Sequence, residues 1–175
     1  MEMSKTTEPA LSTKARTTLD RIAVAIATAG GAGFAPKAPG TMGSLVGVGL
    51  FGLITYSGWY SLYWPFLGAI LAAGTWSAGH VERIYGHDNS KIVIDEVIGL
   101  MITIGFVRGP GTPAIAIELI LGFSLFRFFD ILKPFPLRRL ERLSRGLGVV
   151  ADDVGAGIYG LIVLMFLKFL VARIS

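Results

Sequence analysis

The chain has 175 residues and a mass of 18.7 kDa, which is the size of a single domain. Hydrophobic residues make up 53% of it and charged residues only 16%, with a net charge of +4, whereas soluble domains carry about 25% charged residues. This composition excludes intrinsic disorder and a nucleic-acid-binding arm, and the absence of cysteine from the sequence excludes thiolate catalysis, disulfides and cysteine metal sites. A mean hydropathy of +0.64 instead indicates an integral membrane protein.

The amino-terminal part divides into a polar tail and an uncharged stretch. Residues 1–20 are polar and lack the apolar core of a signal peptide, so we expect a flexible cytoplasmic tail ahead of one membrane domain, residues 21–175. Residues 21–29 predict a short amphipathic helix. No charged residue occurs from 38 to 79, which is long enough for two membrane passes of about 20 residues each. The small and aromatic residues 57–61 predict the turn between them.

Polar and apolar segments alternate in the rest of the chain. Residues 80–91 predict a polar loop, 108–113 a tight turn rich in Gly and Pro, and 133–151 a loop rich in arginine. The apolar segments between and after these are 92–107, 114–132 and 154–171. The first of them would be about 24 Å long as a helix, which is short for a membrane pass. The expected architecture is therefore a compact bundle of about four to five apolar helices, with every polar loop that carries a cluster on the cytoplasmic side.

Glycine is frequent within the apolar segments. It occurs at spacings that allow helices to pack closely. The positions concerned are Gly43, Gly47, Gly155, Gly157 and Gly160.

The first candidate site is the Gly- and Pro-rich stretch 30–44, directly ahead of an apolar segment. Its backbone N–H groups and the start of the next helix could bind an anion. Lys37 would add a charge, and Gly40, Thr41 and Ser44 would add an amide and two hydroxyls. It is not a Walker A motif, because the lysine that precedes the hydroxyl residue there is missing. The alternative is a flexible membrane entry with an N-cap and small packing residues.

Two pairs of adjacent carboxylates form the next candidates. Asp95 and Glu96 interrupt an apolar segment, where a carboxylate costs about 2.5–3.5 kcal/mol. Neighbouring side chains on a helix point about 100° apart, so we do not expect both to face one partner. Asp152 and Asp153 are predicted to open the last helix, where one of them would serve as the N-cap and the second exceeds that need.

A third group lies at the end of the segment 114–132. Arg127 and Asp130 are three residues apart and share a helix face, and Lys133 follows one turn later. This pattern fits either an ion pair at a helix end or a metal-binding aspartate beside two phosphate-binding cations.

Together these clusters predict Mg²⁺-assisted phosphoryl chemistry on a lipid. In this hypothesis Asp95, Glu96, Asp130, Asp152 and Asp153 are the catalytic residues and metal ligands, while Lys37, Arg127 and Lys133 neutralise phosphoryl oxygens. His80 and His87 are expected to have a loop or membrane-boundary role. A small proton- or ion-coupled transporter that uses Asp95 and Glu96 is the alternative.

Four segments together resemble the phosphatidylglycerophosphatase A family: residues 33–44, 92–96, 126–136 and 152–157, in this order. The resemblance implies an all-α fold and Mg²⁺-dependent hydrolysis of phosphatidylglycerophosphate to phosphatidylglycerol and phosphate. It also implies a multi-pass protein of the bacterial cytoplasmic (inner) membrane whose active site faces the cytoplasm. The expected partners are this lipid substrate and membrane lipids, without nucleic acid. The oligomeric state, the number of metal ions, and direct attack by water as against a phosphoenzyme remain open.

Overall fold

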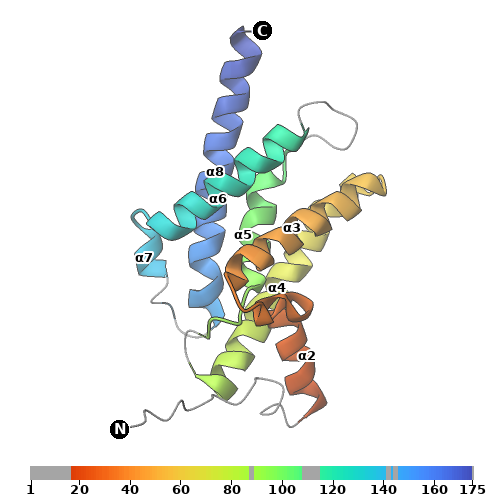
Figure 1. Ribbon diagram of the computed structural model, residues 1–175, viewed down its shortest axis with the longest axis vertical. Coiled ribbons are helices and arrows are strands. Elements are labelled where there is room, and N and C mark those ends of the chain that lie inside the picture. The colour runs from red at the N-terminus through yellow and green to blue at the C-terminus, as the bar shows by residue number, and fades with distance from the viewer. Residues whose placement is uncertain (1–16, 87–88, 108–114, 141–142, 144–145, 175) are drawn as a thin grey trace.

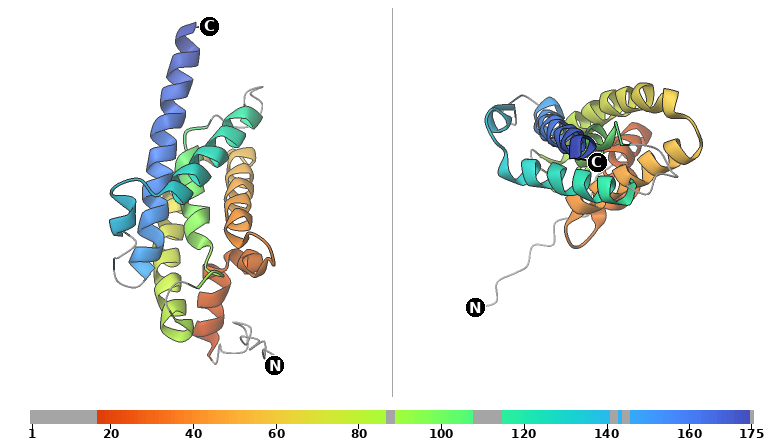
Figure 2. Two further views of the ribbon diagram at one scale, coloured as in Figure 1. Left: turned by 60° about the vertical axis from the view of Figure 1, so that its left-hand side comes forward. Right: turned by 90° about the horizontal axis from the view of Figure 1, so that it is seen from above.

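The computed structural model describes residues 17–86, 89–107, 115–140, 143 and 146–174. These residues contain helices and turns but no strand, which confirms the all-α prediction for the described part of the chain. Figures 1 and 2 show the helices gathered side by side, with the end of the last helix projecting beyond the others. The elements are α2 (Thr18–Ala27), η1 (Ala29–Phe34), α3 (Pro39–Tyr56), η2 (Tyr60–Leu62), α4 (Tyr63–Tyr85), α5 (Ile94–Ile104), α6 (Ile115–Leu132), α7 (Leu137–Leu140) and α8 (Gly146–Ile174).

Helix α5 lies at the centre of the bundle. It contacts α3, α4, α6 and α8, and these helices surround it in Figure 2. Eight of its 11 residues are buried, including Val97, Ile98 and Met101. At 1.5 Å per residue it is only about 16 Å long. The segment 92–107 is therefore short because its helix is enclosed by the bundle, where its apolar side chains contact other helices.

Glycines let the helices approach α5 closely. A Cβ atom at Gly157 of α8 would overlap the Gly99 carbonyl of α5, and one at Gly43 of α3 would lie 2.7 Å from the Val93 carbonyl oxygen. Gly47 and Gly160 are at similarly tight contacts with α5. The predicted role of these four glycines in helix packing is confirmed.

Two helices, α3 and α8, are long and apolar enough to cross a membrane. The apolar segments around 38–56, 62–79, 92–107, 114–132 and 154–171 do contain helices, but the predicted four to five membrane helices are not confirmed at that number. The outer face of α8 is strongly apolar, with Ile162 and Phe166 each more than half exposed. Such a surface is typical of a protein that contacts lipid.

The predicted polar loop at 80–91 is wrong over its first six residues, because α4 continues to Tyr85. This last part of α4 packs against α2, where Val81 is fully buried and His80 contacts the Asp20 carboxylate at 2.9 Å. Helix α2 begins at Thr18, where Thr17 and Asp20 form a capping box. The rest of the predicted tail, residues 1–16, lies outside the described residues, as does the predicted turn at 108–113.

Helix α8 begins at Gly146, six residues before Asp152, at which the sequence pattern predicts that it opens. Gly146 lies against the backbone of α4, and only a residue without a side chain fits there. Asp152 and Asp153 are consequently buried in the second turn of α8, so the prediction that one of them caps the helix is wrong.

Candidate active site

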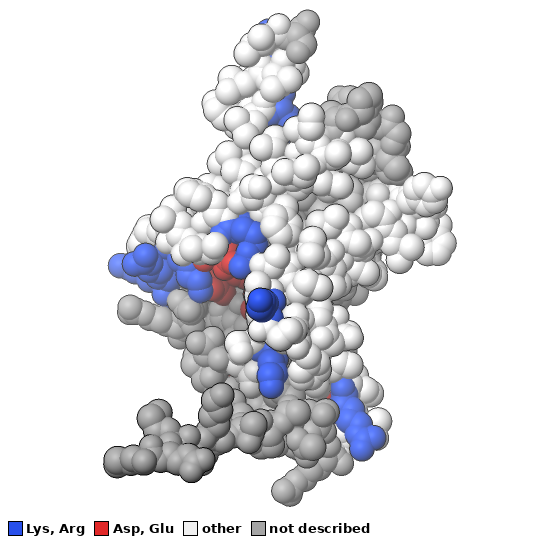
Figure 3. Space-filling model, in the orientation of Figure 1, with Lys and Arg blue, Asp and Glu red and all other residues white. Residues whose placement is uncertain are grey.

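A cavity of about 840 Å³ opens between α3, α5, α6 and α8. Figure 3 shows its acidic side chains in a small hollow, with basic side chains beside them. The structure thus brings the predicted acids, two of the predicted cations and Gly40 to one place. The lining includes Gly40, Asp95, Glu96, Arg127, Asp130, Lys133, Arg138, Asp152 and Asp153.

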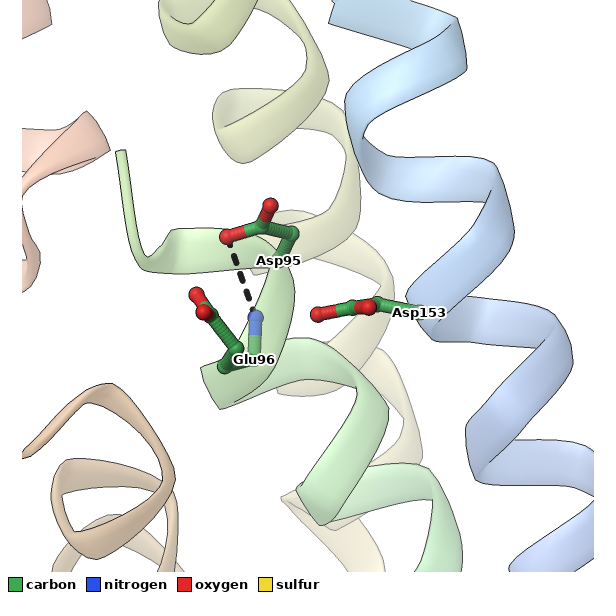
Figure 4. A group of neighbouring side chains, drawn as sticks. All are labelled: Asp95, Glu96 and Asp153. Atoms are coloured by element: carbon green, nitrogen blue, oxygen red, sulfur yellow. Dashed lines mark hydrogen bonds between the residues drawn. The ribbon is translucent and has the colours of Figure 1, made fainter. Parts of the chain in front are cut away.

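Three of the acids form a cluster. Asp95 and Glu96 come from the first turn of α5 and Asp153 from α8. Each offers one carboxylate oxygen, and these three oxygens lie within 4.8 Å of one another. Figure 4 shows the three side chains converging between the two helices, with the Glu96 backbone N–H donating to Asp95 Oδ1 at 3.1 Å. We call these residues the acid triad.

The acid triad corrects the expectation that adjacent carboxylates cannot face one partner. Asp95 and Glu96 lie at the very start of α5, where no preceding turn of helix occupies the space beside them. Both side chains can therefore bend toward the same point. The N–H groups at the start of the helix, one of which donates to Asp95, partly offset the negative charge there.

The surroundings of the triad disfavour its negative charge. Burial raises the pKa of Asp95 well above its ordinary value, and the charges of Glu96 and Asp153 raise it further. Burial also raises the pKa of Glu96. Glu96 Oε2 is buried and accepts no hydrogen bond within the described part of the chain. Because a buried carboxylate needs compensation, this donor set fits a hard divalent cation that prefers oxygen ligands.

The other two acids are paired with cations. Asp130 Oδ2 lies 2.8 Å from Arg127 Nη1 on the same face of α6, as the spacing predicts. Asp152 Oδ2 of α8 lies 2.6 Å from Lys133 Nζ, which follows α6. Lys133 has a φ of 44°, an unusual backbone conformation for a residue other than glycine. The described lining carries five carboxylates and three cationic side chains, and so a formal excess of two negative charges.

The start of α3 also borders the cavity. Pro39 occupies the first turn, and no side chain caps the helix, so backbone N–H groups remain available for an anion. Gly40 contacts the Glu96 carboxylate so closely that a Cβ atom would overlap it. Ala38, directly before the helix, has a φ of 48° and sets the turn that brings the helix start to the site.

Three of the predicted phosphate-binding residues lie outside the cavity lining. Lys37 is exposed beside it, and Thr41 is half-buried in α3. Ser44 is fully buried, and its hydroxyl donates to the Gly40 carbonyl of its own helix at 3.1 Å.

Conversely, Arg138 lines the cavity, although the sequence pattern places it only in the arginine-rich loop 133–151 and assigns it no role at the site. The sequence could have indicated this place in the cavity, because Arg138 follows closely after the turn 133–136. His80 belongs to the contact between α2 and α4, and His87 lies outside the described residues.

Comparison with known proteins gives a consistent family. The model of the phosphatidylglycerophosphatase A family matches residues 25–168. The chain is 36% identical over 142 residues to a Haemophilus influenzae protein and 35% identical over 141 residues to an Escherichia coli protein, both named phosphatidylglycerophosphatase A. These alignments cover 79% and 78% of this chain, and 84% and 78% of the relatives.

A third relative carries a different name. A Bacteroides thetaiotaomicron protein with the provisional name phosphatidylinositol-3-phosphatase is 35% identical over 155 residues, covering 85% of this chain and 94% of its own. No solved structure matches the chain significantly.

Proposed function

The chain belongs to the phosphatidylglycerophosphatase A family, and on this premise we propose that it hydrolyses the terminal phosphate of phosphatidylglycerophosphate. Water supplies the oxygen that forms a bond to phosphorus, the bond from phosphorus to the headgroup oxygen breaks, and that oxygen takes up a proton. The products are phosphatidylglycerol and inorganic phosphate. The observation that carries the proposal is the acid triad beside two ion-paired cations in one cavity.

The acid triad is where a divalent cation would bind. Asp95, Glu96 and Asp153 would hold Mg²⁺, because their oxygens converge and Glu96 Oε2 lacks a partner within the described residues. When bound, such an ion polarises the phosphate and lowers the pKa of a coordinated water.

The remaining lining residues would bind and orient the phosphate. Arg127 and Lys133 are held in place by Asp130 and Asp152, so their N–H groups face the cavity without further ordering. The free N–H groups at the start of α3 add donors of fixed direction. Donors arranged in advance around developing negative charge are a major source of catalysis.

The lipids for which the relatives are named differ in headgroup but share the same reacting group. Both lipids carry a phosphomonoester on a headgroup that a phosphodiester joins to diacylglycerol. The exposed apolar faces of α3 and α8 support a site in which the acyl chains stay in the membrane, which we place in the bacterial cytoplasmic membrane with the cavity on its cytoplasmic side. A transporter is not favoured, because the relatives named for an activity are phosphatases.

Phosphate release from phosphatidylglycerophosphate in mixed micelles tests the proposal. We expect release by the wild type with Mg²⁺, no release after EDTA, and loss of release in Asp153→Asn. Glu118→Gln is the matched control, because Glu118 pairs with Lys168 and does not line the cavity. Release that persists in EDTA would contradict the metal site, and no release by the folded wild type would contradict the activity.

A further inference from the structure

Arg138 lies at the boundary between the active-site cavity and a second hollow. The second hollow has a volume of about 570 Å³ and adjoins the first, because Lys133 and Arg138 line both. Arg138 projects from α7, directly after the turn that ends α6, and is exposed. A ligand that extends out of the cavity past Arg138 would therefore enter the second hollow.

Arg138 differs from the other two cations of the cavity in its partners. Arg127 and Lys133 are engaged in ion pairs with Asp130 and Asp152. The Arg138 side chain makes no hydrogen bond or ion pair with any residue that the structure describes. Its guanidinium is therefore available to a ligand, and a guanidinium binds two phosphate oxygens at once.

The second hollow is apolar apart from its cations. Leu132, Pro134, Phe135 and Pro136 line it, and the Phe135 side chain is 71% exposed. Arg139 lies over the Phe135 ring at 4.8 Å from its centre. An apolar hollow with a cation at its inner edge matches the part of a phospholipid where the headgroup phosphate meets the glycerol and acyl chains.

The segment that carries Arg138 is well anchored. Leu137 is 1% exposed, and the Tyr159 hydroxyl of α8 donates to the Phe135 carbonyl at 3.1 Å. The backbone N–H of Arg139 donates to the Pro136 carbonyl at 2.7 Å. The position of the Arg138 backbone relative to the cavity is therefore fixed, as selective recognition requires.

We propose that Arg138 binds the phosphodiester group of the lipid substrate while the terminal phosphate lies at the acid triad. Arg138 then determines specificity, because it selects lipids that carry a second phosphate between the diacylglycerol and the phosphomonoester. This inference rests on the proposed function for the identity of the lipid. It adds a residue that binds a different part of the substrate from the part that reacts.

Steady-state kinetics in mixed micelles test the inference with Arg138→Gln and, as the matched control, Arg173→Gln, because Arg173 also lies over a phenylalanine ring but lines neither hollow. We expect Arg138→Gln to raise the KM for phosphatidylglycerophosphate about tenfold, as loss of one charge-assisted contact predicts, with kcat nearly unchanged. Inhibition by phosphatidylglycerol, which has only the phosphodiester, should weaken similarly. Inhibition by inorganic phosphate should not change, and Arg173→Gln should resemble the wild type throughout.

A binding measurement keeps this test separate from the activity. Short-chain phosphatidylglycerol is titrated into the wild type and both variants and followed by calorimetry. Arg138→Gln should weaken binding about tenfold relative to Arg173→Gln. Equal affinities of the two variants for phosphatidylglycerol would overturn the role of Arg138. So would a loss of inhibition by inorganic phosphate in Arg138→Gln that is as large as its loss of inhibition by phosphatidylglycerol. A wild type that binds phosphatidylglycerol through Arg138 but releases no phosphate would overturn only the proposed function.

Discussion

Replacing Gly40 with alanine should damage the active site while leaving the fold intact. The new Cβ atom would overlap Glu96 Oε1 and would also lie 3.1 Å from Glu96 Cδ and 3.3 Å from Arg127 Nη1. Because the Glu96 carboxylate is the end of a flexible side chain, it can yield, and restoring ordinary contact moves it by roughly 1 Å. A displacement of that size at a reacting centre lowers activity about 100-fold, which corresponds to about 2.7 kcal/mol in the activation free energy.

The assay compares kcat/KM for phosphatidylglycerophosphate with the thermal midpoint of unfolding. Gly52→Ala is the control on the same helix, because a Cβ atom at Gly52 would have no neighbour within 4 Å, and alanine there favours helix by up to about 1 kcal/mol. We expect Gly40→Ala to lose activity at an unchanged midpoint, with partial recovery at high Mg²⁺. Full activity of Gly40→Ala would refute the contact between Gly40 and Glu96 as a determinant of the site.

Three further predictions concern the metal, an ion pair and a helix contact. Mg²⁺ at about 100 times its Kd should stabilise the wild type by about 2.7 kcal/mol, raising the thermal midpoint by about 5–10 °C, and Asp153→Asn should abolish this rise in differential scanning fluorimetry. Lys133→Met removes the ion pair of Lys133 with the buried Asp152 carboxylate and should lower the free energy of unfolding by about 1.5–3 kcal/mol, as measured by denaturant titration. Adding Asp152→Asn to it should restore stability but not phosphate release. Gly157→Ala presses against the Gly99 carbonyl and should cost at least about 1–3 kcal/mol, so a normal unfolding midpoint would contradict the packing of α5 on α8.

The sequence alone predicts which residues gather at the site better than it predicts how they interact. The clusters lie far apart in the chain, but all of them carry charged or anion-binding groups that suit phosphoryl chemistry. Their convergence on one site follows from this shared chemistry and from the expectation that their loops lie on one side of the membrane. The division into an acid triad and two ion pairs depends on where α5 begins and on how α8 packs against it. No local spacing determines these tertiary distances, and Asp153 shows this most directly, because it is buried where α8 packs closely against Gly99 of α5.

Helix boundaries are harder to predict than helix packing in this chain. The polar residues at 80–85 resemble a loop in hydropathy, yet they continue α4 because α2 covers them and Asp20 contacts His80. Packing against a neighbouring helix can thus hide polar residues that a hydropathy pattern assigns to water. The close contacts of Gly43, Gly47, Gly157 and Gly160, in contrast, were predictable, since glycine at those spacings has few other uses in an apolar helix.

The excess of two negative charges in the cavity imposes an order of events on any phosphatase that uses it. A phosphomonoester that is itself close to doubly charged is repelled by the empty lining, whereas a divalent cation is attracted to it. We therefore expect a divalent cation to bind before the lipid, because binding of the lipid becomes favourable only once this negative charge is cancelled. Turnover would then follow cation occupancy even when the membrane is saturated with substrate.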